Sequence, residues 1–407
     1  MRNLRTFDSL KNPVYRLYYG GMLGQMAAMN MQLVTQSLLI YRLTNSTTIL
    51  GTLALAHAVP LTVLSLFGGV LADRLEKKNI LLTGQSISAL IALCVAFTLA
   101  FGYLSAERAG SWWILIVAAA VQGIVMGLMM PSRQAIIAEI VSPEQLMNAV
   151  ALNTLGMNLL RFMAPAIAGL LIDTYSFEAV YYAMTCMYLV AVFFISFIPR
   201  TGAPGARGQS VFTDLKDSFN YVWNDRTIFL ILGFTLLLVV LSRPYQFLLP
   251  VFSEDILKTD ATGLGVLMSV SGIGAMIGSI FLASLPNKRR GIMLAISGLI
   301  MGMMLVSFSF SESWPLSLVL IGFVGLGDTG RMTLANTLVQ YYVAHDYRGR
   351  VMSLLMMEFG IMSFGVFFAG IIAESIGVQW SVGGMAMVLT LMSILALLFA
   401  QRLRKLD

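Results

Sequence analysis

Five charged side chains stand inside long apolar stretches of the sequence: Arg161, Arg243, Asp328, Arg331 and Glu358. An ionised residue at the centre of a membrane helix costs roughly 2.5–3.5 kcal/mol on insertion scales. Such residues therefore pair, face water or mark the path of an ion or substrate. The chemistry they offer is the binding and release of protons and of charged groups.

Two carboxylates are candidates for proton coupling, because burial in an apolar medium favours the neutral form of such a group. Asp328 and Arg331 are three residues apart on one helical face, so an ion pair that only neutralises Arg331 is the alternative for Asp328. Glu358 has no cation near it on its own helix and is the stronger candidate. Arg161 is expected to hold a neighbouring carboxylate, with Glu358 as one option and an anionic substrate as the alternative. Arg243, next to Pro244, is interpreted as reaching toward the membrane surface, with a gate near the outer face as the alternative.

Uncharged polar side chains form a second set of candidates. Gln25, Gln32 and Gln36 fall near one face of the first apolar stretch, with Gln122 in the fourth and Tyr245 in the seventh. Polar side chains avoid lipid, so we expect this set to line a substrate cavity. Hydrogen bonds between neighbouring helices are the alternative. The 27 methionines would suit a cavity that adapts to varied apolar ligands, although most are expected to be packing residues.

The elements that carry these residues are membrane helices. The chain has 407 residues, of which 58% are hydrophobic and 11% charged, whereas soluble domains carry about 25% charged residues. Apolar runs of about 20 residues recur, the length that a helix needs to cross a bilayer. We predict an all-α membrane protein with twelve transmembrane helices at about 15–41, 49–72, 79–103, 112–138, 147–172, 178–198, 228–252, 263–284, 291–310, 314–341, 351–374 and 380–400.

The distribution of basic residues predicts the orientation. Most of the 26 lysines and arginines fall in the N-terminal segment, the even-numbered connections, the central linker and the C-terminal segment. Basic residues favour the cytoplasmic side, so both termini are expected in the cytoplasm of a multi-pass plasma-membrane protein. Topology thus explains the net charge of +6 without a nucleic-acid partner.

The longest connection divides the spans into two groups of six. We predict an N-terminal six-helix bundle at 1–198, a cytoplasmic linker at 199–226 and a C-terminal six-helix bundle at 227–407. The second part of the linker has apolar residues at helical spacing, which is typical of an amphipathic helix.

The two groups of spans also repeat each other. The stretch that contains PSRQA in the first half aligns with the stretch that contains TGRMT in the second, which sets Arg133 opposite Arg331 at an offset of 198 residues. Repeated six-helix halves are the architecture of a carrier whose binding site lies between the halves near the bilayer midplane.

One loop carries the most specific motif. Gly69, Asp73, Arg74, Lys77 and Lys78 follow the pattern G-x-x-x-D-R-x-x-K-K between the second and third spans. This pattern resembles the loop signature of the major facilitator superfamily, G-x-x-x-D-R-x-G-R-R, with Glu76 in place of its glycine. The resemblance implies a gating motif in which the Asp73 carboxylate meets the start of the eleventh span, near 348–350, and holds the cytoplasmic face closed.

A second resemblance narrows the branch of the family. PSRQA at the end of the fourth span and APAIAG in the fifth are similar to motifs of macrolide-efflux and siderophore exporters. The branch implies a secondary transporter that exports a small apolar or amphipathic compound by alternating access, with protons as the coupling ion. Gln122 and Gly123 match a drug and proton antiporter motif whose arginine is replaced here by Ala119.

Other functions of the same fold stay open at this point: an importer, a lipid-moving carrier or a membrane receptor that transports nothing. The expected partners are a small-molecule substrate, protons and the lipid bilayer, and the protein is expected to be a monomer. No phosphate-binding loop, nucleophile arrangement or metal-ligand cluster occurs in the sequence, so we expect neither an enzyme nor a cofactor.

Overall fold

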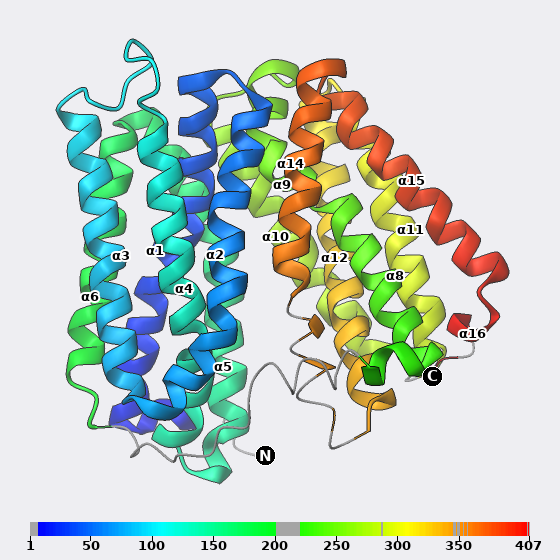
Figure 1. The fold of residues 1–407 in the computed structure, drawn as a ribbon, viewed down its shortest axis with the longest axis horizontal. Coiled ribbons are helices and arrows are strands. Elements are labelled where there is room, and N and C mark those ends of the chain that lie inside the picture. The colour runs from blue at the N-terminus through cyan, green and yellow to red at the C-terminus, as the bar shows by residue number, and fades with distance from the viewer. Residues whose placement is uncertain are drawn as a thin grey trace. The chain divides into compact units, whose positions relative to one another are not determined.

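The structure is a computed structural model that describes residues 7–200, 220–285, 288–344, 347, 351–352, 354–355, 357–404 and 406, apart from the side chains of 66, 69, 70, 72–74 and 359. All regular elements in this part of the chain are helices (Figure 1). Ten of them are long and apolar enough to cross a membrane, and a shorter apolar helix spans Gly360–Ile376. The prediction of an all-α membrane protein is confirmed.

The helices group into two compact units, Met1–Asn45 with Ala56–Gly208 and Ser46–Leu55 with Gln209–Asp407. The helices of the first unit are η1 (Asp8–Lys11), α1 (Pro13–Thr44), most of α2 (Thr47–Arg74), α3 (Lys77–Ala100), α4 (Trp113–Ile140), α5 (Pro143–Thr174) and α6 (Phe177–Ser196). Those of the second unit are α8 (Arg226–Ser242), α9 (Pro244–Val251), η2 (Phe252–Ile256), α10 (Ala261–Ser284), α11 (Arg290–Ser309), α12 (Trp314–Tyr342), α14 (Glu358–Ile376), α15 (Val378–Phe399) and α16 (Gln401–Arg404).

In the first unit, α1 runs antiparallel to α4 in a register fixed by side-chain contacts. These contacts are Asn12 Nδ2 to Ile140 O at 2.9 Å, Tyr18 OH to Arg133 O at 3.2 Å, Gln25 Nε2 to Met126 Sδ at 3.9 Å and Gln36 Nε2 to Leu115 O at 3.2 Å. Each step along α1 is matched by an equal step back along α4, since seven residues separate Tyr18 from Gln25 and Met126 from Arg133. Side-chain contacts therefore link the two helices at four levels along the bundle.

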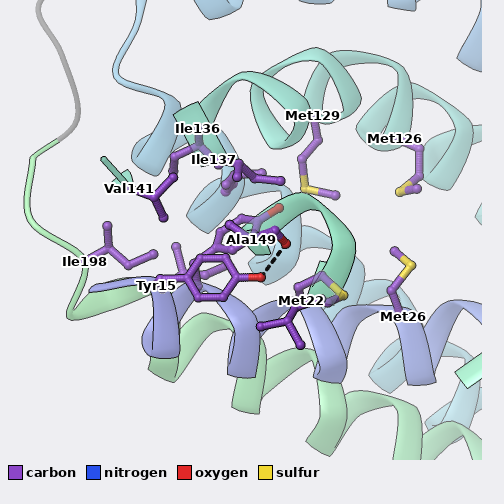
Figure 2. Packing of buried hydrophobic residues seen from close by; sticks show 14 residues of the cluster. Tyr15, Met22, Met26, Met126, Met129, Ile136, Ile137, Val141, Ala149 and Ile198 are labelled. Carbon is purple, nitrogen blue, oxygen red and sulfur yellow. Dashed lines mark hydrogen bonds between the residues drawn. The ribbon is translucent and has the colours of Figure 1, made fainter. Parts of the chain in front are cut away.

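A cluster of buried apolar and aromatic residues fills the space between α1, α4 and α5 (Figure 2). Tyr15 is fully buried there, and its hydroxyl donates a 2.7 Å hydrogen bond to the Ala149 carbonyl on α5. Four methionines, Met22, Met26, Met126 and Met129, form the part of the cluster that lies farther along α1 and toward the middle of α4.

Close helix crossings support the predicted repeat. A Cβ on Gly127 of α4 would lie 2.7 Å from the Leu61 carbonyl oxygen and 3.1 Å from the Ser65 nitrogen of α2. A Cβ on Gly325 of α12 would meet the Ser271 carbonyl oxygen and lie 3.1 Å from the Ala275 nitrogen of α10. In both units the glycine fits between a carbonyl and the amide four residues later, and the two glycines differ by 198 residues. The same offset relates Arg133 to Arg331.

The seventh span is interrupted where the sequence analysis expects one helix. Helix α8 ends at Ser242, α9 begins at Pro244, and a π-helical turn, η2, follows. Proline has no N–H to continue the helical hydrogen bonds, whereas Arg243 keeps helical backbone angles of φ −64° and ψ −27°. The span therefore continues through the interruption.

The start of α2 belongs to the second unit because Glu374 holds it there. The Glu374 carboxylate accepts hydrogen bonds from the Ser46 hydroxyl at 3.0 Å, the Thr47 hydroxyl at 2.9 Å and the Thr48 N–H at 3.1 Å. The Thr47 hydroxyl also donates to the Gly370 carbonyl at 2.7 Å. A carboxylate at this position satisfies free N–H groups of the first helical turn.

The first part of the predicted amphipathic helix lies outside the described residues. Its end is described: the Tyr221 ring stacks on Tyr347 with centroids 4.2 Å apart, and the Tyr221 hydroxyl accepts a 3.1 Å hydrogen bond from the Ala344 N–H. These contacts attach the segment before α8 to the chain that follows α12.

Candidate functional site

A cluster of four charged residues lies inside the second unit, and Asp328 is at its centre. Nη2 of Arg243 donates to both Asp328 oxygens, at 3.1 and 3.0 Å. Arg331, one turn further along α12, donates to Oδ1 of Asp328 from Nη2 at 3.1 Å. The Asp328 side chain is 8% exposed, so two cations stabilise one nearly buried carboxylate.

Glu358 completes the cluster, and its contact is loose. Its Oε2 lies 3.6 Å from Nη1 of Arg331, and neither atom has a hydrogen-bond partner in the part of the chain that the structure describes. Glu358 is the first residue of α14, where the free N–H groups of the helix favour a negative charge. Two arginines and two carboxylates give the cluster no net charge when all four are ionised.

Arg243 is the member that the sequence analysis placed wrongly. Its side chain is 14% exposed and binds Asp328, so it does not extend to the membrane surface. Nη1 of Arg243 also donates to the Gln246 side chain at 2.9 Å. The interruption at Pro244 is the sequence feature that could have marked this arginine as a site residue.

The remaining charge partner, Arg161, lies partly buried on α5 in the first unit. The ion pair of Glu358 that the structure shows is with Arg331, within the second unit. Tyr245 is 4% exposed on α9, and its hydroxyl lies 3.3 Å from the Ser271 hydroxyl on α10. Tyr245 follows Arg243 closely and adds a neutral polar group to the same unit.

The predicted glutamines lie in the first unit, and their hydrogen-bond partners are uncharged. Gln32 and Gln36 are linked at 3.2 Å, the Tyr188 hydroxyl donates to Gln32 at 3.4 Å, and Gln122 donates to the Ser88 hydroxyl at 3.1 Å. These residues line a small internal cavity between α1, α3, α4 and α6. Gln25 is 3% exposed and contacts Met126.

The described lysines of the gating motif bind within the first unit. Nζ of Lys77 lies 2.6 Å from Oε1 of Glu139, and Nζ of Lys78 donates to the Ser196 carbonyl at 2.7 Å. The side chains of Asp73 and Arg74, the contacts of Gly69 and residues 348–350 lie outside what the structure describes. The cytoplasmic contact that the resemblance implies therefore stays a prediction.

Taken together, the long apolar helices, the repeat at Gly127 and Gly325 and the buried charge cluster define a polytopic membrane transporter of two repeated halves. In the described chain, histidine, cysteine, aspartate and glutamate side chains form no group of three or more that could hold a metal ion.

Comparison with known proteins identifies the family. The family model described as Major Facilitator Superfamily matches residues 18–364, and the chain belongs to this family. The chain is 26% identical over 370 residues to the staphyloferrin A transporter of Staphylococcus aureus (strain NCTC 8325 / PS 47), covering 89% of this chain and 88% of the relative. It is 24% identical over 366 residues to the multidrug efflux pump Tap of Mycolicibacterium fortuitum, covering 87% of each chain. Macrolide efflux protein A of Streptococcus pyogenes is 22% identical over 369 residues, which cover 88% of this chain and 89% of the relative.

Solved structures agree on the fold. A bacterial homolog to the human lysosomal transporter Spinster matches with a TM-score of 0.74 at 13% identity, covering 99% of this chain and 98% of that structure. A POT family transporter in complex with 5-aminolevulinic acid matches with a TM-score of 0.75 at 10% identity, covering 96% of each. The chain is therefore a multi-pass membrane transporter with relatives of the efflux type.

Proposed function

We propose that the protein exports a small apolar or amphipathic compound across the plasma membrane in exchange for protons, by alternating access and with both termini in the cytoplasm. Three relatives are named as a siderophore transporter, a multidrug efflux pump and a macrolide efflux protein, which supports outward movement of a small molecule. The basic segments at the predicted cytoplasmic connections support the orientation.

The contact between Glu358 and Arg331 carries the proposal of proton coupling. Asp328 accepts hydrogen bonds from two arginines, so a proton on Asp328 would disrupt several charge-assisted bonds. Glu358 has one cation at 3.6 Å and no hydrogen bond to it, so protonation there disrupts the least. Glu358 is therefore the proposed proton carrier, and Asp328 holds the two arginines in place.

Protonation of Glu358 changes the charge of the cluster. The cluster goes from neutral to a net charge of +1, and Arg331 keeps Asp328 as its ion-pair partner. A change of one buried charge can shift the balance between two conformations of a carrier. The exchange cycle then requires that one conformation binds the proton and the other binds the exported compound.

Inside-out membrane vesicles test this function with ethidium as the probe. We expect an imposed pH gradient, acidic inside, to drive ethidium into vesicles that contain the wild-type protein, and a protonophore to abolish that uptake. Glu358→Gln should lower gradient-driven uptake at least about tenfold and retain exchange of ethidium at equal concentrations on both sides. Glu312→Gln, an exposed carboxylate between α11 and α12, is the matched control.

Other outcomes separate the alternatives. A Glu358→Gln protein that concentrates ethidium as well as the wild type would show that Glu358 does not couple transport to protons. Movement driven only in the opposite direction would indicate an importer, and no movement of ethidium in either direction would favour a receptor or a carrier of lipids.

A further inference from the structure

Arg133 on α4 differs from Arg331, its counterpart in the repeat, because the described part of the chain places no carboxylate beside it. No acidic oxygen of the described residues lies within 4.0 Å of its guanidinium. Arg331 lies within that distance of two carboxylates. The Arg133 side chain is partly buried in an apolar bundle, where an uncompensated charge is unfavourable.

The Arg133 side chain does not extend toward the nearest membrane surface. The Arg133 carbonyl is level with Tyr18, whereas Nη1 lies 3.9 Å from Sδ of Met26, eight residues further along α1. In the antiparallel register this direction leads away from the end of α4 at Ile140 and toward its middle. The guanidinium therefore extends along the bundle, toward the membrane interior.

The hydrogen-bond donors around Arg133 face poor acceptors. The side-chain contact of Arg133 is the thioether of Met26, and Nε2 of Gln25 likewise faces the thioether of Met126 at 3.9 Å. A thioether sulfur is a weak hydrogen-bond acceptor, whereas a guanidinium has five N–H donors in a planar fork. Methionine side chains are also flexible and can give way to a ligand. The arrangement thus offers a positive charge and hydrogen-bond donors next to Met26, which belongs to the apolar cluster drawn in Figure 2.

A purely structural role would leave these donors unexplained. A buried ion pair would neutralise the charge, as it does at Arg331. A soft metal cation bound by the methionine sulfurs would be repelled by the guanidinium. An anion with several oxygen acceptors satisfies the charge and the donors together.

We propose that Arg133 binds the acidic group of a transported compound, so that amphipathic anions with a carboxylate or a similar acidic oxygen group are among the substrates of this carrier. The apolar body of such a compound would contact the methionines. The proposal rests on the proposed export function and adds the chemical class that it handles.

Two fluorescent probes with the same apolar body test the proposal: 1-pyrenebutyrate, an anion, and 1-pyrenebutanol, its neutral analogue. Binding is measured on the full-length protein in lipid nanodiscs, with empty nanodiscs subtracted. We expect the wild type to bind the anion at least about tenfold more tightly than the alcohol, as a charge-assisted bidentate contact allows. Arg133→Gln should remove this preference and leave the affinity for the alcohol within about twofold.

Matched variants separate the effect of charge from that of folding. Arg133→Lys keeps the positive charge and should retain part of the preference for the anion. Arg42→Gln removes an exposed arginine at the end of α1 and should retain all of it. Unchanged affinity of Arg133→Gln for 1-pyrenebutanol shows that this variant is folded.

Three results would overturn the proposal: a wild type that does not prefer the anion, a wild type that binds neither probe, or an Arg133→Gln variant that keeps the preference. The ethidium assay reports on export independently, because ethidium is a cation. Proton-driven ethidium export without a preference for the anion would reject this substrate class and leave the export function standing. A preference for the anion without proton-driven export of ethidium would reject the export function and leave the anion-binding role of Arg133 standing.

Discussion

Two arginines at corresponding positions of the repeat have opposite surroundings. Arg331 in the second unit is 2% exposed and forms ion pairs with Asp328 and Glu358. Arg133 in the first unit is partly buried beside Met26 and Tyr18 and has no carboxylate within 4.0 Å among the described residues. The glycines that precede them by six residues pack in the same way, so the difference arises from the side chains around each arginine and not from the helix crossing.

Under the proposed function, the two halves of the repeat would have different roles. A charge cluster with no net charge can change its state when a single proton binds, which suits coupling. An arginine beside which the described residues place no carboxylate can bind an anion from outside, which suits recognition. Changes around Arg331 should therefore affect proton coupling and leave anion binding unchanged. Changes around Arg133 should affect anion binding and leave proton coupling unchanged.

The largest loss of stability is expected from Asp328→Asn, which removes the carboxylate that two arginines share. Removal of one partner of a buried ion pair costs about 3–5 kcal/mol, because it leaves buried charge uncompensated. Thermal unfolding of the detergent-solubilised protein, followed by tryptophan fluorescence, should show a clear loss of stability relative to Glu312→Gln. The double variant Asp328→Asn, Arg243→Gln should recover part of the loss, and a single variant as stable as the control would contradict the shared role of Asp328.

Smaller effects are expected at the paired glycines. Gly325→Ala and Gly127→Ala each place a methyl group against a backbone carbonyl of the neighbouring helix, and overpacking of this kind costs about 1–3 kcal/mol. Gly325 should be the more sensitive of the two, because its contact with the Ser271 carbonyl is the closer one. Gly384→Ala on α15 is the control, since a Cβ there meets nothing within 4 Å. Equal stability of all three variants in the same unfolding assay would show that these crossings can separate.

The comparison of the two arginines can also be tested by placing a carboxylate next to Arg133. Met130 stands three residues before Arg133, as Asp328 stands before Arg331. Met130→Asp should therefore pair with Arg133 and lower the affinity for 1-pyrenebutyrate about tenfold, close to 1.4 kcal/mol. Met130→Asn is the isosteric neutral control and should retain the preference for the anion. If both variants lose it equally, the methionine itself and not the charge of Arg133 determines binding.

The parts of this structure that could be predicted from the sequence depend on local pattern. Helical spans follow from runs of about 20 apolar residues, and the pair of Asp328 with Arg331 follows from a spacing of three on one helix. The repeat offset was also visible in the sequence, and the packing of Gly127 and Gly325 agrees with it.

The parts that could not be predicted depend on how helices lie against each other. Arg243 and Asp328 are 85 residues apart and meet because α8 and α12 pack side by side. The contact of Arg133 with Met26 spans 107 residues and depends on the register of α1 against α4. Apolar periodicity gives the buried face of a helix, but many registers bury the same face, so the partners of a buried charge do not follow from it.

The smallest effect is expected at Lys77 and Glu139, the ion pair between the start of α3 and the last turn of α4. Nζ and Oε1 are 2.6 Å apart, and the side chains are 15% and 30% exposed. Exposed ion pairs contribute about 0.2–1 kcal/mol and are screened by salt. A double-mutant cycle with Lys77→Met and Glu139→Gln should therefore give a coupling energy below about 1 kcal/mol that falls further at high salt. Lys77 also belongs to the motif that the family resemblance assigns to gating. A Lys77→Met variant with slowed ethidium export and unchanged stability would therefore show that this lysine acts in gating as well as in the packing of its own unit.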